Sequence, residues 1–257
     1  MDLKLKDRII FIGGASRGIG LGIAETCLAE GAKVAISARG EKGLDQTRER
    51  LSSIYGKDRL WSSSGDLTDA ATVDKMVNAV EAEFGPIWGA VANVGLHPTP
   101  PGFDVSDENW EGGFNQNLNS AYMLSRSALR HMEKRGEGAL LLITSIAGMA
   151  ALETPLTYGT AKAAMNHLAK ELARLVGPKG IRVNALAPGN IIFPGGDWEK
   201  RQNGERGQAW NRWIKREVPL QRFGTPDEIG SVAAYMLSPL ASFMTGAIVP
   251  IDGGQSR

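Results

Sequence analysis

Short apolar runs and longer amphipathic stretches alternate along the whole chain. The short runs are rich in Val, Ile and Ala, as is typical of strands that are buried on both faces. We expect strands at 8–12, 33–38, 59–63, 87–92, 139–144, 181–187 and 247–251. The stretches between them have helical length and periodicity. We expect helices at 18–30, 41–55, 69–84, 117–134, 155–176 and 226–237.

Strands that alternate with helices predict right-handed crossovers and a parallel sheet with helices on both faces. The predicted fold is therefore α/β, a doubly wound sheet of about seven parallel strands. No linker or low-complexity tract divides the chain, so residues 1–257 are predicted to form one domain. Residues 193–216 break the alternation and are predicted to be an insertion.

Composition narrows the possible partners and compartments. The 29 basic and 28 acidic residues nearly cancel, which argues against a nucleic-acid partner. No apolar run approaches the roughly 18 residues of a membrane span, and the start lacks the apolar region of a secretory signal. The single cysteine, Cys27, favours a reducing compartment. We therefore expect a soluble, cytoplasmic protein that binds neither nucleic acid nor membrane.

A glycine-rich segment, GGASRGIG at residues 13–20, lies between the first expected strand and the first expected helix. This is where a doubly wound sheet binds a nucleotide, because the glycines let the backbone approach a pyrophosphate at the helix N-terminus. The spacing is not that of a P-loop, and no lysine follows it. A glycine-rich turn without a ligand is the alternative. The residues expected to contact the cofactor here are Gly14, Ser16, Arg17, Gly18, Ile19 and Gly20.

A second set of residues suggests acid–base chemistry. Tyr158 and Lys162 are four residues apart in an expected helix, so their side chains lie on one face. Ser145 ends the preceding expected strand, and Asn117 opens the helix before it. A lysine ammonium favours the phenolate and lowers the pKa of a nearby tyrosine. Such a tyrosine suits proton transfer to the alkoxide that hydride transfer to a carbonyl creates.

Together these residues resemble the short-chain dehydrogenase/reductase superfamily, along nearly the whole chain and in its single-domain branch similar to 3-oxoacyl-ACP reductases. Residues 13–20 are similar to the family's T-G-x-x-x-G-I-G loop, with Gly13 in place of threonine. The resemblance implies an NAD(P)-binding Rossmann-like domain. It implies that Tyr158 is the general acid/base, Lys162 also holds the nicotinamide ribose, Ser145 binds the substrate oxygen and Asn117 orders a water.

Further cofactor contacts come only from the resemblance. Asp66 and Leu67 correspond to the family's contact with the adenine ring. Asn93 and Gly95 correspond to the segment that supports the sheet beside the cofactor. Pro188, Gly189 and Ile191 correspond to the turn near the nicotinamide. The threonine that usually follows the Pro-Gly turn is replaced, because the chain reads NIIF there.

The end of the second expected strand bears on the choice of cofactor. NAD sites usually have an acidic residue there, whereas this strand ends at Arg39. Arg39 and Arg17 are expected to clamp a 2′-phosphate, as in the NADP-preferring branch of the family. Two solvated arginines on an NAD enzyme are the alternative. We predict that NADP(H) is preferred and that NAD(H) is possible, with no metal.

The resemblance also implies that residues 193–216 form a mobile lid over the substrate. Trp198, Trp210 and Trp213 then line an apolar or aromatic substrate pocket, or they pack the lid onto the body or a neighbouring subunit. The lid arginines, Arg201, Arg206, Arg212 and Arg216, meet an acidic substrate or form a solvated face. His97 is either a substrate contact or an ordinary loop residue.

The predicted function is hydride transfer between NADP(H) and a secondary alcohol or ketone. By analogy with the family, the assembly is expected to be a homotetramer or a homodimer. The alternatives are a non-catalytic NAD(P)-binding sensor or scaffold, an NAD-dependent alcohol dehydrogenase, and an epimerase or dehydratase. Epimerases and dehydratases of this superfamily usually have a longer C-terminal substrate domain than this chain.

Overall fold

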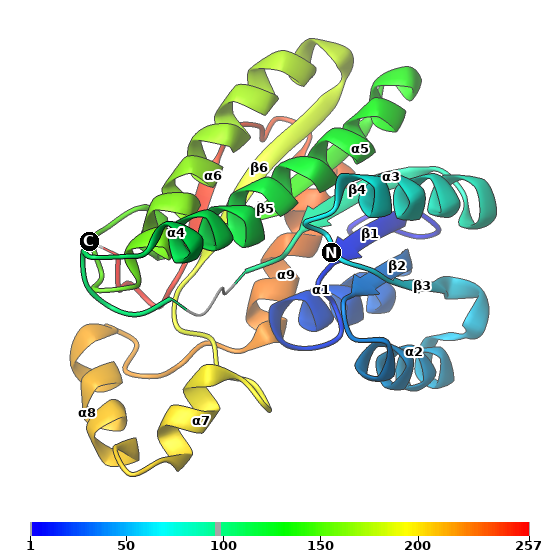
Figure 1. The fold of residues 1–257 in the computed structure, drawn as a ribbon. Helices are drawn as coiled ribbons and strands as arrows, with labels where there is room; N and C mark the ends of the chain where they lie inside the picture. Colours follow the sequence, from blue (N-terminus) through cyan, green and yellow to red (C-terminus); the bar gives the residue numbers. More distant parts are fainter. Residues whose placement is uncertain (1, 96–98, 257) are drawn as a thin grey trace.

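The strands of the computed structural model, which describes residues 2–95 and 99–256, form one parallel sheet. Its order is β3-β2-β1-β4-β5-β6-β7 (Figure 1). The strands are β1 (Ile9–Gly13), β2 (Lys33–Ala38), β3 (Leu60–Ser64), β4 (Ile87–Ala92), β5 (Gly138–Ile143), β6 (Ile181–Pro188) and β7 (Ile248–Ile251). The chain reverses its direction of travel across the sheet between β1 and β4, which creates the crevice where such folds bind ligands. The predicted doubly wound parallel sheet is confirmed.

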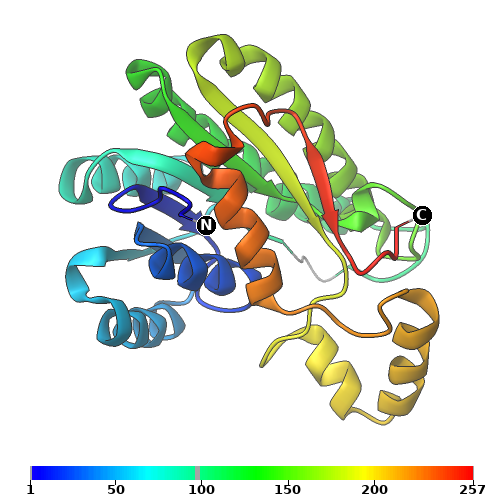
Figure 2. The ribbon, with the colours of Figure 1, turned by 180° about the vertical axis from the view of Figure 1, so that it is seen from behind.

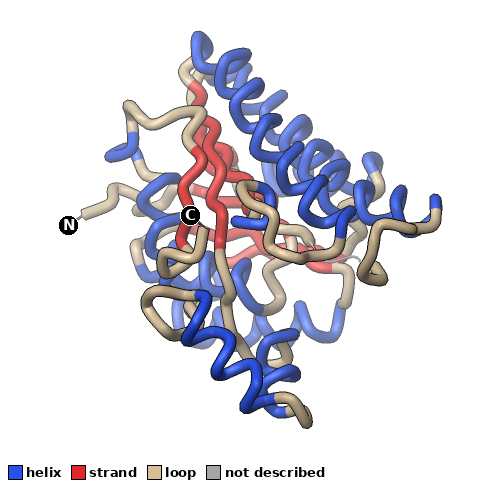
Figure 3. Tube along the Cα trace, turned by 90° about the vertical axis from the view of Figure 1, so that its left-hand side faces the viewer, coloured by secondary structure: helices blue, strands red, loops and turns tan. Residues whose placement is uncertain are grey.

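Helices cover both faces of this sheet. They are α1 (Gly18–Ala29), α2 (Glu41–Tyr55), α3 (Ala70–Ala79), α4 (Asp107–Phe114), α5 (Ser120–Arg135), α6 (Leu156–Val176), α7 (Asp197–Asn203), α8 (Gly207–Glu217) and α9 (Pro226–Leu237). Figure 3 shows the sheet between its helical layers. α3, α5 and α6 lie on one face, and α1, α2 and α9 lie on the other, which faces the viewer in Figure 2. None of the described helices is both long and apolar enough to cross a membrane.

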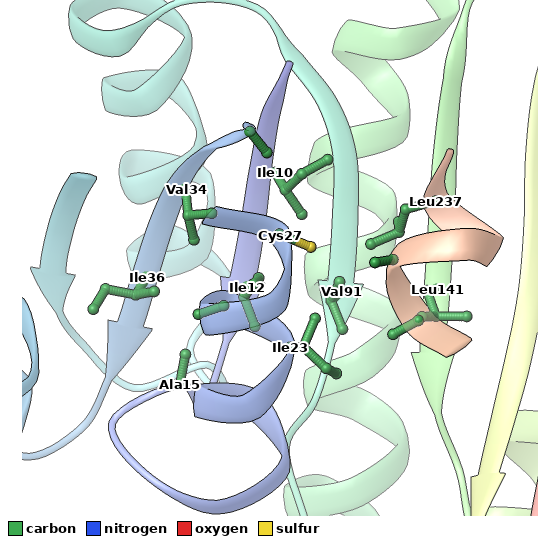
Figure 4. Close-up of a cluster of buried hydrophobic side chains, with 14 of the residues drawn as sticks. Ile10, Ile12, Ala15, Ile23, Cys27, Val34, Ile36, Val91, Leu141 and Leu237 are labelled. Carbon is green, nitrogen blue, oxygen red and sulfur yellow. The ribbon is translucent and has the colours of Figure 1, made fainter. Parts of the chain in front are cut away.

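Alternation along the strands produces two cores, one on each side of the sheet. Ile10 and Ile12 of β1 pack toward α1 and α9, whereas Ile9 and Phe11 pack toward α3, α5 and α6. Figure 4 shows the first core, in which Cys27 of α1 lies among aliphatic side chains. A continuous apolar run is therefore needed in each central strand, because both of its faces are buried.

One expected helix begins earlier in the chain than the pattern predicted. The helix expected at 117–134 instead starts at Asp107 as α4, continues through a π-helical segment at Asn115–Asn119, and ends with α5 at Arg135. Glycine is required at position 113, near the end of α4, because a Cβ there would lie 2.7 Å from the Cβ of Thr157 on α6. Asn117 therefore lies inside a continuous helical stretch and does not open a helix.

The expected insertion at 193–216 folds into α7 and α8, which project beside the main body at the lower left of Figure 1. The following helix, α9, begins where the sequence predicted, with Thr225 as its N-cap. Glu228 accepts a hydrogen bond from the Thr225 backbone N–H at 2.9 Å, which closes a capping box. The remaining predicted strands and helices are all present, with ends that differ by one or a few residues.

Candidate active site

Four predicted site segments meet at the carboxyl ends of neighbouring strands. The glycine loop follows β1, Asn93 follows β4, Ser145 lies just beyond β5, and Pro188 ends β6. These strands are adjacent in the sheet. The fold therefore gathers segments that are far apart in the sequence around one crevice.

The glycine loop has the backbone shape of a phosphate cradle. Gly14 and Gly18 have φ values of +68° and +60°, in the left-handed region that favours glycine. A Cβ on Gly20 would lie 2.4 Å from the carbonyl oxygen of Gly14. Arg17 is the N-cap residue of α1, and its side chain makes no capping hydrogen bond in the described part of the chain. The first backbone N–H groups of the helix therefore lack a side-chain acceptor from the N-cap residue. These residues fit a pyrophosphate at the N-terminus of α1.

Hydrogen bonds from two other segments hold this loop in place. The Asn93 side-chain amide donates to the carbonyl oxygens of Gly14 at 2.9 Å and Gly13 at 3.3 Å. The Thr47 hydroxyl donates to the carbonyl oxygen of Ser16 at 3.0 Å. Asn93 thus joins the end of β4 to the loop after β1, across the point where the sheet order reverses.

Lys162 is buried beneath the reaction centre that the sequence predicted. Its side chain is only 3% exposed, and its Nζ donates to the carbonyl oxygens of Ile143 at 3.0 Å and Val94 at 3.4 Å. The Nζ atom lies 5.7 Å from the centre of the Tyr158 ring. Burial disfavours the ammonium form and lowers the pKa of Lys162 to about 7.

Tyr158 and Ser145 line the same cavity, and the Ser145 hydroxyl is near enough to affect the pKa of Tyr158. The Ser145 hydroxyl accepts a hydrogen bond from the backbone N–H of Ala147 at 3.1 Å. Close packing brings the two residues together: a Cβ on Gly148 would lie 2.5 Å from the backbone of Lys162, so the loop after β5 lies directly against α6. The prediction that the pKa of Tyr158 is lowered is wrong for this structure. Burial raises the pKa of Tyr158, and the nearby Ser145 hydroxyl lowers it only in part.

Asn117 has one side-chain atom that lacks a partner. Its amide N–H donates to the carbonyl oxygen of Gly113 at 2.9 Å, whereas Oδ1 is buried without a hydrogen bond from any described residue. A Cβ on Gly95 would lie 3.3 Å from this Oδ1 and 3.5 Å from Lys162 Nζ, so both atoms border the same space. A buried acceptor of this kind usually binds water. The geometry fits a water between Asn117 and Lys162.

The two arginines expected at the adenosine end contact different segments. Arg39 donates to the side-chain oxygen of Gln116 at 3.3 Å, and Arg17 donates to the carbonyl oxygen of Gly195 at 2.9 Å. The clamp on a 2′-phosphate therefore stays a prediction. The Asp66 carboxylate is exposed and accepts from the backbone and the hydroxyl of Thr68, both at 2.9 Å.

A cavity of about 790 Å³ joins this centre to α7 and α8. Its lining includes Ser145, Tyr158, Gly189, Ile191 and Ile19, together with the three tryptophans and four arginines of residues 193–216. Trp198 stacks on Trp213 at 5.5 Å between ring centres and meets Phe223 at 5.2 Å. The same rings therefore line the cavity and pack α7 against α8, whereas contact with a substrate and packing of the lid onto the body or a neighbouring subunit stay predictions. His97 lies outside the described residues.

Sequence reasoning missed several residues of this region. Gln116, which contacts Arg39, lies in the π-helical segment and carries no motif. Glu153 and Gln255 also line the cavity. The carbonyl oxygens that bind Lys162 are backbone atoms, so no residue type in the sequence indicates them. The start of α4 did leave a signal: Ser106 is its N-cap, and Asp107 and Glu108 follow in the first turn.

Comparison with known proteins agrees with this geometry. A family profile described as "Enoyl-(Acyl carrier protein) reductase" matches residues 14–256. The chain is 33% identical over 256 residues to a 3-oxoacyl-[acyl-carrier-protein] reductase of Chlamydia muridarum, covering 100% of both chains. It is 30% identical over 256 residues to 2-(S)-hydroxypropyl-CoM dehydrogenase 3 of Xanthobacter autotrophicus, covering 100% of this chain and 99% of the relative.

Solved structures are similar as well. L-sorbose reductase from Gluconobacter frateurii, complexed with NADPH and L-sorbose, superposes with a TM-score of 0.93 at 29% identity, covering 100% of this chain and 99% of the other. A gluconate 5-dehydrogenase from Burkholderia cenocepacia, in complex with NADP and tartrate, gives 0.89 at 26% identity, covering 99% and 97%. The chain therefore belongs to the short-chain dehydrogenase/reductase superfamily of NAD(P)(H)-dependent oxidoreductases.

Proposed function

We propose that the protein transfers a hydride between NADP(H) and a secondary alcohol or ketone, with Tyr158 as the general acid/base. One observation carries this proposal. The side chains of Ser145 and Tyr158 line one cavity, and buried Lys162 lies 5.7 Å from the centre of the Tyr158 ring. Residues at the carboxyl ends of the neighbouring strands fit a dinucleotide at the same edge of the sheet.

Ser145 and Tyr158 act together on the substrate oxygen. During reduction, negative charge develops on that oxygen, and two hydroxyl donors stabilise it as an oxyanion hole does. Tyr158 then gives its proton to the alkoxide, and in the reverse direction it accepts the proton of the alcohol. The bound nicotinamide cofactor supplies or accepts the hydride.

Lys162 and Asn117 handle the proton that Tyr158 exchanges. Burial raises the pKa of Tyr158, which keeps its hydroxyl protonated and ready to act as an acid near neutral pH. Lys162, with a pKa of about 7, changes its charge in the same pH range. Its ammonium form favours the phenolate and so favours alcohol oxidation. A water between Lys162 Nζ and Asn117 Oδ1 links this pair to the proton exchange.

NADP(H) is proposed as the preferred cofactor because Arg39 follows the second strand where NAD sites usually have a carboxylate. L-sorbose reductase, the similar structure described above, binds NADPH. Titration with NADPH and with NADH tests this proposal. We expect NADPH to bind at least about tenfold more tightly, and Arg39→Gln to remove the difference. Equal affinity in the wild-type protein would refute the preference.

Residues 193–216 are proposed to act as a lid over the site. Phe193 lies against the glycine loop, because a Cβ on Gly18 would come within 2.7 Å of its ring. The hydrogen bond from Arg17 to Gly195 joins the same two segments. The lid therefore begins next to the position proposed for the cofactor phosphates.

The decisive experiment follows NADPH oxidation with a panel of ketones. We expect turnover by the wild-type protein, and a loss of about 10² to 10⁴ in rate for Tyr158→Phe, because the proton donor is removed. NADPH affinity should be retained in this variant. Equal activity of the two proteins would contradict the role of Tyr158. If NADPH binds and neither protein turns over any ketone, the non-catalytic sensor is supported instead.

We also propose a cytoplasmic homotetramer, with a homodimer as the alternative. Large apolar side chains are exposed on the two long helices and next to the last strand, namely Tyr122 on α5, Leu175 on α6 and Phe243 before β7. Burying such side chains against another copy is favourable. Light scattering of the purified protein tests the assembly, and a monomer at micromolar concentration would contradict it.

A further inference from the structure

Four arginines of the lid line the same cavity as Ser145 and Tyr158. They are Arg201 on α7, Arg206 between the two helices, and Arg212 and Arg216 on α8. Two carboxylates, Glu153 and Asp197, also line the cavity. Four positive and two negative side chains leave the described lining with an excess of positive charge, although the chain as a whole is nearly neutral. A cavity with such a lining attracts anions.

Three of the four lid arginines differ from arginines that pair with a carboxylate of the protein. Arg222 pairs with Glu228 through both of its terminal nitrogens, at 2.9 and 2.6 Å. Arg216 contacts the adjacent Glu217 at 2.7 Å. For Arg201, Arg206 and Arg212, no carboxylate of residues 2–95 or 99–256 lies within ion-pair distance. Their charges remain available to a ligand.

Arg201 is held in place by aromatic rings. Its guanidinium lies 4.9 Å from the Trp198 ring centre and 5.1 Å from that of Trp210. Arg206 lies 5.7 Å from Trp210. Stacking on indoles orients a guanidinium but leaves its charge and its N–H donors free at the edge. Such an arginine is prepared to bind an oxyanion, because little side-chain freedom remains to be lost.

The cavity has a volume of about 790 Å³ and reaches from the expected cofactor contacts Ile19, Gly189 and Ile191 to residues 193–216, so cofactor and substrate would share it. The indoles of Trp198, Trp210 and Trp213 supply apolar wall to the same cavity that the reacting hydroxyls and the lid arginines line. The cofactor phosphates do not account for these arginines, because the glycine loop at the N-terminus of α1 already fits them.

We infer that the substrate carries an oxyanion group, a carboxylate or a phosphate, remote from its reacting carbon, and that Arg201, Arg206 and Arg212 bind this group. The inference rests on the proposed oxidoreductase function and specifies its substrate class. Ser145 and Tyr158 bind the carbonyl or alcohol oxygen at one part of the cavity, and the lid arginines bind the anion at another. A neutral ketone of the same shape would lack the second contact.

Calorimetric titration of the NADP⁺-loaded protein tests the inference with matched ligands. The pairs are para-acetylbenzoate and its methyl ester, levulinate and its methyl ester, and para-acetylphenyl phosphate and para-methoxyacetophenone. In at least one pair we expect the anion to bind at least about tenfold more tightly, as a charge-assisted hydrogen bond allows. Comparing the carboxylate pairs with the phosphate pair identifies the anion. Added salt should weaken only anion binding.

Substitutions locate the binding group. Arg201→Gln should reduce or remove the preference for the anion, Arg201→Lys should restore part of it, and Arg206→Gln and Arg212→Gln should each weaken it. Arg48→Gln is the control, because Arg48 is exposed on α2 and does not line the cavity. It should leave the preference unchanged.

The outcomes separate this inference from the proposed function. The inference is overturned if no anion is preferred in any pair, or if the preference survives the combined substitution of Arg201, Arg206 and Arg212 by Gln. If the esters are nevertheless reduced by NADPH in a Tyr158-dependent manner, the proposed function stands alone. If anions are preferred but no ligand is reduced, the anion site stands and the proposed reaction fails.

Discussion

Replacing Lys162 with Met should stabilise the cofactor-free protein at neutral pH while abolishing its proposed activity. Lys162 is 3% exposed, and burial lowers its pKa from 10.5 to about 7. At about 1.4 kcal/mol per pH unit, this shift corresponds to a destabilisation of about 5 kcal/mol by the buried ammonium. The variant also loses the hydrogen bonds to Ile143 and Val94, worth about 1–3 kcal/mol together. We expect a net gain of about 2–4 kcal/mol.

The gain should depend on pH in one direction. Below pH 7 the lysine is protonated in the folded and the unfolded chain, so the full penalty applies. Between pH 7 and 10.5 the unfolded chain binds the proton and the folded chain does not, so the stability contributed by this site rises with pH. The advantage of Lys162→Met should therefore be greatest below pH 7 and should disappear as the pH approaches 10.5.

Urea unfolding at several pH values measures this effect. Lys170→Met is the matched control, because Lys170 is exposed on the same helix and should change stability little. A Lys162→Met variant that is less stable than wild type at pH 6, or whose effect does not vary with pH, would refute the reasoning.

Three further predictions concern the glycine loop and the core. Gly20→Ala should reduce NADPH affinity at least about tenfold, because its Cβ would lie 2.4 Å from the carbonyl oxygen of Gly14; unchanged affinity in a titration would argue against the cradle. Asn93→Ala should lower stability by about 1–3 kcal/mol in urea unfolding, because two loop carbonyls lose their donor; wild-type stability would show that these bonds do not hold the loop. Cys27 is fully buried with a pKa raised to about 12, so its thiol should react with a disulfide reagent only after unfolding, and rapid labelling of the native protein would contradict this.

The sheet was predictable from the sequence because burial on both faces imposes long apolar runs on its strands. Ile10 and Ile12 face one core while Ile9 and Phe11 face the other, so no polar residue is tolerated in β1. Helix ends also leave local signals: Gly31, just after α1, has a φ of +90°, and Thr225 is the N-cap of α9. The pairing of Tyr158 with Lys162 was predictable because a four-residue spacing within one helix places both side chains on the same face.

Other features depend on contacts that no local pattern records. Gly112 and Gly113 argue against a helix, yet α4 forms because Gly113 lets it approach Thr157 on α6. The π-helical segment that holds Asn117 is likewise not predicted by local propensity. The pKa of Tyr158 was predicted to fall because its burial is not visible in the sequence. The assignment of all residues to one domain stays a prediction.

The tryptophan cluster gives the lid an optical signature of its own. Three of the six tryptophans of the chain, Trp198, Trp210 and Trp213, have ring centres 5.5 to 5.8 Å apart. Indoles at this separation couple their electronic transitions, and the coupling depends steeply on their mutual angles. Circular dichroism in the indole bands should therefore be dominated by α7 and α8. Any rearrangement of these two helices can be followed in the native protein without an attached dye.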